Sequence, residues 1–472
     1  MIDPMARGSA DNERLRTPQP VFRRRLPSGR GAMEQPNATG DGPASLSVRF
    51  WCAVLMTGVA TGLLGDLMMI LLFAVQRWAF HYQDGTFESG VEQASGIRRV
   101  GSLVIAGIFG GGAWWVLRRI TRGKPSEIDE ALWNGSGQLS FGRSLGTSVI
   151  SEIVIGMGAS LGREAAPKLL GGASGSKLSQ WLGLSPAQQR LLVACGGGAG
   201  LAAVYNVPLG GALFTAEILC GSITLPTVLP ALACSWIATA TAWLYLPTAP
   251  TYADIPAYRS SPGLVVWALL TGVLIGGFAA GYIRVIGWLS HHRLSGWQAA
   301  LAPLVAFGVL GLIGLAYPQL FGNGKDIAHD VFLGMGSWPL LLALFLLKPV
   351  VTALCLGSGA SGGLFTPVMC TGALMGALLG TGWSQLFPGV PVGAFAMIGA
   401  AAMVGAAMQA PLSALALVLE LTHSGFALMV PMIAATVVAT AVTRHLDGYS
   451  IYTARLPARA APPVSSNSSQ EL

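Results

Sequence analysis

Two glycine- and proline-rich motifs carry residues that could bind a small anion. The first, Gly162–Pro167 (GREAAP), places Arg163 and Glu164 at the expected start of a helix. The second, Gly357–Pro367 (GSGASGGLFTP), is rich in glycine, which lets backbone amides approach a ligand closely. The free N–H groups at a helix N-terminus carry partial positive charge and therefore favour anions. We predict an anion-binding site where these two motifs begin their helices.

Glu164 has two interpretations from its chemistry alone. A carboxylate at a helix N-terminus can occupy the anion site itself, and when protonated it can swing out and admit an anion. Alternatively, Arg163 and Glu164 form a structural pair at a helix end. The second motif also has an alternative interpretation, as a glycine-rich packing seam between helices. The residues by themselves leave these alternatives open.

The rest of the chain has the composition of a membrane protein. Of its 472 residues, 52% are hydrophobic and only 10% are charged, against about 25% in soluble domains. Residues 191–253 contain a single charged side chain, Glu217, and residues 349–443 contain only Glu420. Such stretches must lie in lipid, with each glutamate facing protein or water. This composition excludes an ordinary soluble enzyme, a disordered chain and a disulfide scaffold.

The apolar segments that must position the two motifs are numerous, and several are short. Crossing about 30 Å of hydrocarbon takes roughly 20 apolar residues, and several segments fall below that length. Glycine or proline interrupts many of them, for example at Pro208 and Pro411. Broken helices are tolerated where they line a cavity within the protein, so this pattern is typical of a transporter or channel core. The apolar segments lie at about 50–76, 100–117, 145–161, 188–204, 208–221, 224–246, 263–289, 297–316, 332–356, 366–386, 393–408, 410–421 and 426–443.

An internal repeat relates the two halves of the chain. Segments 208–217 and 411–420 share the pattern PL-x7-E at an offset of 203 residues, and segments 162–167 and 362–367 share G-x4-P at an offset of 200. Chance alignment of Gly- and Ala-rich helices is the alternative, but it does not explain why the two lone glutamates fall into register. Membrane repeats place the substrate site at their interface, where broken helices direct their N-termini. The repeat therefore predicts an anion pathway between the halves.

The charge distribution predicts the orientation in the membrane. The net charge is +7, and basic residues concentrate at Arg23–Arg25 and in segment 118–124. Such basic flanks mark the cytosolic side of a membrane protein, so both termini are expected in the cytosol. A folded basic face that would bind nucleic acid is not evident. The six cysteines lie in apolar segments and the six histidines lack metal-ligand spacing, so neither a metal nor a cofactor is predicted.

Four regions follow from this pattern. Residues 1–46 are expected to be a disordered cytosolic tail. The first and second membrane halves are expected at 47–250 and 260–445. Residues 446–472 form a short cytosolic tail that carries Tyr452 and is too short for an appended regulatory domain.

The motifs closely resemble those of the ClC chloride channel and Cl⁻/H⁺ exchanger family. GREAAP at 162–167 corresponds to the family's GREGP, and GGLFTP at 362–367 corresponds to GIFAP. The run AAVYNVPLGGALFTAE at 202–217, GNG at 322–324 and SIY at 450–452 add to the resemblance, which covers nearly the whole membrane region. The last motifs are most similar to those of the bacterial voltage-gated ClC-type branch.

The resemblance implies an all-α membrane fold, a ClC-type inverted repeat with many tilted and discontinuous helices. It also implies a homodimer in the lipid bilayer of a bacterial inner membrane, with one anion pathway in each subunit. Glu164 falls on the gating glutamate, which competes with the outer anion and carries the proton. Tyr452 falls on a tyrosine that contacts the anion from the cytosolic side; the alternative is a tyrosine of the interfacial belt. The implied anion-binding residues are Arg163, Glu164, Ala165, Gly363, Leu364, Phe365 and Tyr452.

Two departures from the family pattern concern the anion. The family's first helix break carries a serine that contacts the anion, whereas here Gly123 falls at that place and Ser126 substitutes only if the loop shifts. After Glu164, the family's Gly-Pro is replaced by two alanines, and Lys168 follows. Lys168 either adds positive charge near the pathway or extends its amine away from it. Preference for chloride over other monovalent anions therefore stays open.

A third departure concerns the proton. Exchangers of the family commonly carry an inner relay glutamate directly after a structural glutamate. Here Glu217 holds the structural position and Ile218, which cannot hold a proton, holds the relay position. Glu217 lies about 100° around the helix from Ile218, so we interpret it, and its repeat mate Glu420, as structural carboxylates.

We therefore predict transport of chloride or similar monovalent anions, gated by the protonatable Glu164. Exchange of chloride for protons is favoured, and an uncoupled voltage- or pH-gated channel is the alternative because of Ile218. A polytopic membrane enzyme is a remote alternative from another class, and the spans contain no HExxH, GxSxG or paired aspartates that would support it. The protein is thus predicted not to be an enzyme, and no catalytic residue is assigned.

Overall fold

The computed structural model describes residues 46–121, 127–134 and 137–456, and over these residues every regular element is a helix. Extended pairing within this part of the chain is limited to one isolated bridge, between Gly162 and Gly363. The predicted all-α fold class is thus confirmed. Arg23–Arg25, Gly123 and Ser126, together with most of both expected tails, lie outside the described residues.

The first part of the chain forms nine α-helices among the described residues. They are α1 (Val48–Phe80), α2 (Phe87–Gln93), α3 (Gly96–Ile120), α4 (Ile128–Asn134), α5 (Phe141–Gly156), α6 (Ala165–Trp181), α7 (Pro186–Tyr205), α8 (Pro208–Phe214) and α9 (Leu225–Ala242). A π-helical turn, η2 (Thr215–Leu219), continues α8.

The second part of the chain forms eight more. They are α10 (Pro262–His291), α11 (Gln298–Ala316), α12 (Lys325–Phe332), α13 (Trp338–Gly357), α14 (Phe365–Leu386), α15 (Val392–Met408), α16 (Pro411–Thr422) and α17 (Met429–Leu446). Short 3₁₀ turns are η3 (Pro318–Leu320), η4 (Phe426–Leu428) and η5 (Thr453–Arg455).

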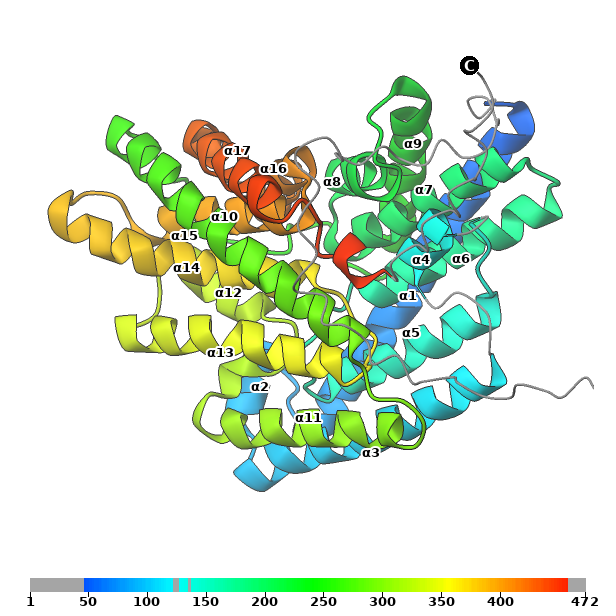
Figure 1. The fold of residues 1–472 in the computed structure, drawn as a ribbon, viewed down its shortest axis with the longest axis horizontal. Coiled ribbons are helices and arrows are strands. Elements are labelled where there is room, and N and C mark those ends of the chain that lie inside the picture. Colours follow the sequence, from blue (N-terminus) through cyan, green and yellow to red (C-terminus); the bar gives the residue numbers. More distant parts are fainter. Residues whose placement is uncertain (1–45, 122–126, 135–136, 457–472) are drawn as a thin grey trace, which may run out of the picture. The chain divides into compact units, whose positions relative to one another are not determined.

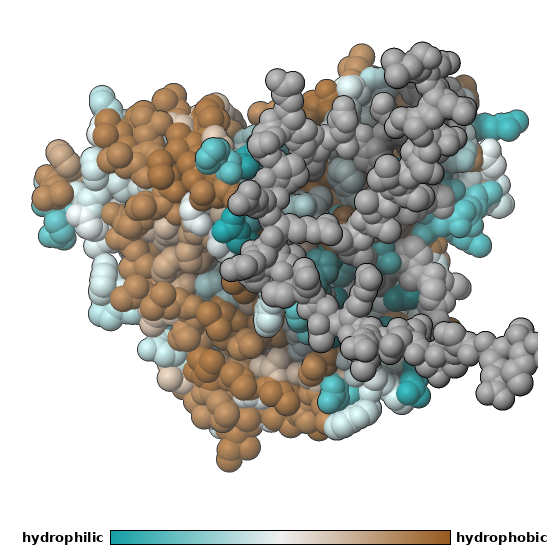
Figure 2. All heavy atoms as spheres, in the orientation of Figure 1, coloured by the Kyte–Doolittle hydropathy of each residue, from teal (hydrophilic) through white to brown (hydrophobic). Residues whose placement is uncertain are grey.

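Eight helices of the described part are long and apolar enough to cross a membrane, by length and composition. These are α1, α3, α9, α10, α11, α13, α14 and the segment Phe426–Leu446 that includes α17. Figure 2 shows a hydrophobic surface over α10, α13 and α17. Exposed apolar side chains on these helices include Val266, Leu270, Leu346 and Val437. Apolar side chains turned outward on so many long helices fit a lipid environment.

The core is formed chiefly by α7 and α15, which other helices surround. In α15, every residue from Gly393 to Met408 is buried, and α7 is buried from Leu191 to Tyr205. α7 packs against α6, and α15 packs against α14, so the two repeats present equivalent helix pairs. Around them, α3 lies along α11 and α10 lies along α17 (Figure 1).

One predicted segment is divided in the structure. The apolar run expected at 332–356 begins as the end of α12, breaks, and resumes as α13. Gly334 and Gly336 adopt positive φ angles of 81° and 107°, which end the first helix. Two further helices, α2 and α4, carry several charged residues, so a search for apolar runs misses them.

The internal repeat is visible in matched helix ends. α7 ends at Asn206 and α15 ends at Gln409, and both residues adopt the left-handed conformation with φ of 57° and 56°. α8 and α16 then start at Pro208 and Pro411. The repeat aligns Asn206 with Gln409, and both halves have the same left-handed turn at this position. The two halves therefore share the same local backbone structure here.

The two lone glutamates bind each other's repeat. Glu420, at the end of α16, accepts hydrogen bonds from the N–H groups of Leu209 (3.0 Å) and Gly210 (2.6 Å) at the start of α8. Glu217, in the turn that continues α8, accepts from the N–H groups of Leu412 (3.3 Å) and Ser413 (2.7 Å) at the start of α16. Each carboxylate thereby satisfies free amides and complements the positive end of a helix from the other half.

Replacing Glu420 with alanine is expected to destabilise the fold by about 1 to 2 kcal/mol, because two amides of α8 lose their acceptor. The measurement is the apparent melting temperature in detergent. Glu420→Gln keeps one oxygen acceptor and is expected to melt between the wild type and the alanine variant. A melting temperature of Glu420→Ala equal to that of the wild type would contradict this role.

Candidate functional site

The two motifs meet through their backbones. The N–H of Gly162 donates to the carbonyl of Gly363 at 2.8 Å, and the N–H of Gly363 donates to the carbonyl of Gly162 at 2.7 Å. This bridge holds the segments before α6 and α14 antiparallel to each other. The N-termini of the two broken helices are thus brought to one place, as the repeat predicts.

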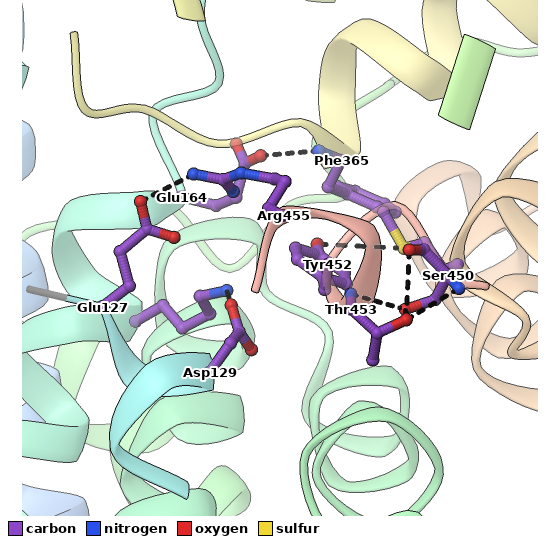
Figure 3. Close-up of polar contacts among 10 residues, drawn as sticks. Glu127, Asp129, Glu164, Phe365, Ser450, Tyr452, Thr453 and Arg455 are labelled. Atoms are coloured by element: carbon purple, nitrogen blue, oxygen red, sulfur yellow. Dashed lines mark hydrogen bonds and ion pairs between the residues drawn. The ribbon is translucent and has the colours of Figure 1, made fainter. Parts of the chain in front are cut away.

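Glu164 occupies the N-terminus of the opposite helix. Its carboxylate accepts a hydrogen bond from the N–H of Phe365, the first residue of α14, at 2.8 Å (Figure 3). The Tyr205 hydroxyl donates to the second oxygen at 3.0 Å, and Thr366 lies 3.4 Å from the same oxygen. Glu164 precedes α6 but makes no side-chain cap bond to it. A negative group therefore lies, buried at 3% exposure, where a helix N-terminus favours an anion.

The two bridging glycines create the space for this carboxylate. A Cβ atom added at either Gly162 or Gly363 would collide with the carboxylate of Glu164. The second motif is therefore more than a packing seam between helices, since the absence of a side chain at Gly363 leaves room for the Glu164 carboxylate.

A cavity lies beside Glu164 and collects most of the predicted anion-binding residues. Glu164, Ala165, Gly363, Leu364 and Tyr452 all line it. Phe365 adjoins this group through its amide bond to Glu164.

Tyr452 is held at the cavity by its own backbone neighbours. The N–H of Ile451 donates to the carbonyl of Ala407 at 2.8 Å, and Ser450 and Thr453 exchange hydrogen bonds around the turn. The tyrosine is buried, its ring meets Phe214 edge-on at 6.0 Å, and its hydroxyl lies 4.0 Å from the sulfur of Met408 (Figure 3). A buried ring inside the protein is not the exposed position of an interfacial belt tyrosine.

Lys168 also lines this cavity. Its Nζ lies 3.6 Å from Oδ2 of Asp129, and the side chains are 14% and 6% exposed. The same amine lies 4.5 Å from the centre of the Tyr452 ring and 5.6 Å from that of Phe214. Lys168 therefore does not extend its amine away from the site, and its charge lies at the cavity that Glu164 also lines.

A second ion pair borders the cavity. Arg455 Nη2 lies 2.6 Å from Oε1 of Glu127 (Figure 3). Burial opposes ionisation of Glu127, but the nearby cations, Arg455 first, lower its pKa below the ordinary value. An adjoining cavity shares Glu127 and is also lined by Arg118, Arg143 and Arg293. These arginines give the approach to Glu164 on this side a strongly basic character, which concentrates anions.

Arg163 faces a different cavity. With Lys325, Asn323 and Asp326 it lines a vestibule between α1, α12 and the loop before α2. Its guanidinium carbon lies 5.0 Å from the Tyr205 ring centre, and no ion pair joins it to Glu164. The interpretation of Arg163 and Glu164 as a structural ion pair is therefore not supported, and Arg163 is separated from the other predicted anion-binding residues.

Three buried polar residues in this region were not predicted from the sequence. Tyr205 lies within the motif at 202–217, but only the fold brings its hydroxyl to Glu164. Lys348 is fully buried and donates to the carbonyls of Leu320 (3.1 Å) and Gly322 (2.8 Å), which fixes the loop before α12. Glu152 is fully buried on α5. A signal for Glu152 was present, since it is the single charged residue of the apolar segment 145–161.

An acidic cluster lies beside the vestibule. The N–H of Glu88, on α2, donates to Oδ2 of Asp326 on α12 at 2.9 Å. Burial first, and then the charges of Asp330, Asp326 and Glu92, raise the pKa of the Glu88 carboxyl to about 8. Glu88 thus holds a proton in the folded protein near neutral pH.

Comparison with known proteins gives a consistent result. Residues 103–444 match the family model described as voltage gated chloride channel. A chloride channel protein of Ralstonia nicotianae, described as ClcB-like, is 33% identical over 369 residues, covering 74% of this chain and 84% of the relative. The H(+)/Cl(-) exchange transporter ClcA of Yersinia pestis bv. Antiqua is 30% identical over 312 residues, covering 64% of this chain and 65% of the relative.

Solved structures show the same fold at lower identity. The crystal structure of a slow cyanobacterial Cl⁻/H⁺ antiporter matches with a TM-score of 0.76 at 23% identity, covering 87% of this chain and 97% of that chain. A CLC-type fluoride/proton antiporter matches with a TM-score of 0.69 at 20% identity, covering 86% of this chain and 97% of that chain. The ClC-type arrangement of helices that the motif resemblance implied is confirmed by these matches.

The acidic cluster gives a prediction about stability and pH. Because the folded protein binds the Glu88 proton more tightly than the unfolded chain, the unfolded chain loses its proton first as pH rises. Stability from this group is therefore expected to fall between about pH 4.5 and about pH 8. Glu88→Gln is expected to melt at a higher temperature than the wild type above about pH 8, with a flatter pH profile. Parallel profiles would contradict this, and exposed Asp84→Asn is the control.

Proposed function

Because this chain belongs to the voltage-gated chloride channel family, we propose that it transports chloride or similar monovalent anions through a pathway gated by Glu164. The observation that carries the proposal is the hydrogen bond from the Phe365 amide to the Glu164 carboxylate at the N-terminus of α14. A carboxylate held there occupies the position that an anion would take. Family membership argues against the remote alternative of a polytopic membrane enzyme, whose reaction would need a catalytic group.

The gate works by competition for one set of donors. While Glu164 is ionised, its carboxylate uses the Phe365 amide and the Tyr205 hydroxyl. Protonation removes the charge, so the attraction to the positive end of α14 weakens and the side chain leaves. An anion then takes over the donors, and its departure lets the ionised side chain return.

The inner part of the pathway is proposed to bind the anion weakly. The proposed contacts in this inner part are Glu164, Ala165, Gly363, Leu364, Phe365 and Tyr452. Arg163 acts from the vestibule on the other side of Glu164 rather than from the cavity. Amides and hydroxyls replace part of the hydration shell of an anion and still let it leave, as conduction requires.

Lys168 adds a charge to this inner part. The family's pathway serine has no described counterpart here, because Gly123 and Ser126 lie outside the described residues. Lys168 reaches the same cavity as Glu164 and Tyr452, and Asp129 at 3.6 Å partly neutralises it. We propose that this lysine attracts the anion into the cavity, and that the aspartate keeps the binding weak enough for release.

Exchange of chloride for protons is proposed, with an uncoupled voltage- or pH-gated channel as the alternative. Exchange is supported by the relative named as an H(+)/Cl(-) exchange transporter. Ile218 favours the channel, since it is buried and apolar at the position of the inner proton relay. An exchanger with this residue requires an inner proton route that does not use position 218.

The chain is a multi-pass membrane protein. We propose that it lies in a bacterial inner membrane, as a homodimer with both termini in the cytosol. The clustered arginines Arg118, Arg143 and Arg293 support this orientation, because basic residues accumulate on the cytosolic side. Exposed apolar side chains on α10 and α17 provide surface for lipid or for a second subunit.

Glu164→Gln tests the gate. Glutamine mimics the protonated side chain, so anion flux is expected to persist while its pH dependence and any proton movement are lost. The measurement is simultaneous chloride and proton flux from proteoliposomes. Valinomycin is added so that the membrane potential built up by chloride efflux does not stop the flux. Wild-type vesicles that drive protons uphill would identify an exchanger, and chloride efflux without protons would identify a channel. Unchanged pH-dependent flux in Glu164→Gln would refute the gate assignment.

Lys168→Met tests the inner charge. Methionine keeps a similar length and loses the positive charge, so anion affinity is expected to fall by about ten-fold, or roughly 1.4 kcal/mol. Calorimetric titration with chloride measures the affinity. Lys168→Arg is the matched control, since it keeps the charge and is expected to remain within a few-fold of the wild type. Equal affinities in the methionine variant and the wild type would exclude Lys168 as an anion contact.

A further inference from the structure

Glu152 is a buried carboxylic acid that the proposed gate does not use. It lies in α5 and is 0% exposed, and neither of its side-chain oxygens has a hydrogen-bond partner among the described residues. Structural carboxylates in this chain behave differently, since Glu217 and Glu420 each accept two or more hydrogen bonds. A buried acid without partners has no evident role in stabilising the fold.

The surroundings of Glu152 connect it to both motifs. The preceding Ser151 donates to the carbonyl of Ser361 at 2.7 Å, and Ser148, one turn earlier, donates to the carbonyl of Ala166 at 3.2 Å. One turn further on, Ile155 lines the vestibule together with Arg163. Glu152 therefore lies in the wall between the vestibule and the gate.

Two charged groups act on Glu152. Burial opposes its ionised form most strongly; of the nearby charges, Arg163 favours that form and Glu164 opposes it. Val75 of α1 lies against Gly156 at the end of α5. Arg163 itself has a buried Nε without a hydrogen-bond partner among the described residues. The immediate group thus consists of two carboxyl groups and one guanidinium.

The charges of this group favour one proton on the two acids. Two negative charges close together in a low-dielectric interior repel each other, and a single guanidinium balances only one of them.

We propose that Glu152 is a second proton-binding residue of the pathway, and that it exchanges one proton with Glu164 across Arg163. When Glu164 is ionised and bound to α14, Glu152 is the neutral acid. When Glu164 leaves as the neutral acid, the proton has moved from the Glu152 carboxyl oxygen to the Glu164 carboxylate, and the Glu152 carboxylate is balanced by Arg163. The step needs no other reactant, and the nearby vestibule supplies the next proton. This inference rests on the proposed gating role of Glu164.

Infrared difference spectroscopy tests the proton directly. In detergent-purified protein, the C=O stretching band of a protonated carboxyl is expected near neutral pH in the wild type and is expected to lose intensity in Glu152→Gln. In Glu164→Gln the Glu152 band is expected to disappear at a lower pH than in the wild type, because the repelling charge is gone. This second measurement retains Glu152 and so remains informative if Glu152→Gln does not fold. Exposed Asp84→Asn is the control and is expected to match the wild type.

Flux measurements separate this inference from the proposed function. In proteoliposomes, Glu152→Gln is expected to keep anion flux, while proton flux, or the pH response of anion flux in an uncoupled protein, falls by about ten-fold. Glu152→Asp keeps the acid and is expected to restore part of the response. Identical carboxyl spectra and pH responses in wild type and Glu152→Gln would overturn the inference. If Glu164→Gln also behaved as wild type, the gating assignment itself would fail, whereas a normal Glu164→Gln result would confine the failure to Glu152.

Discussion

A carboxylate from one half of the chain satisfies the free amides at the start of a helix from the other half, and the architecture depends on this contact. It occurs three times, with Glu164 at α14, Glu217 at α16 and Glu420 at α8. Within a membrane, free amides at a helix start have no water to bind, so an acceptor must come from the protein. Broken helices can exist here because the opposite repeat supplies that acceptor.

The three contacts differ in what else surrounds them. Glu217 and Glu420 each bind two backbone amides, and Glu217 also accepts from the hydroxyl of Ser413. Glu164 accepts a hydrogen bond from one backbone amide and another from the Tyr205 hydroxyl. Its carboxylate also lies against a cavity. The same contact is therefore a fixed structural link at two positions and, in the proposed function, a releasable one at the third. Glu164 differs from Glu217 and Glu420 in having one backbone amide fewer and a cavity beside it. These two differences are small compared with the difference in the proposed roles.

The sequence predicted the elements that repeat and missed the contacts that depend on tertiary packing. Glycine, proline and the lone glutamates are strong local signals, and they located the helix starts at α6, α8, α14 and α16. Arg163 shows the limit of a motif, since its neighbour in sequence lines one cavity while it faces another. Tyr205 reaches Glu164 from 41 residues away, and no periodicity indicates such a contact. The side to which Lys168 extends likewise depends on Asp129 and Tyr452, which belong to other segments.

The paired backbone hydrogen bonds between Gly162 and Gly363 limit how this protein can move. These hydrogen bonds join the two halves directly beside the Glu164 carboxylate. Rocking of one half against the other, a common way for repeat-built transporters to alternate access, would have to break both bonds. Movement of the Glu164 side chain alone would leave both bonds intact.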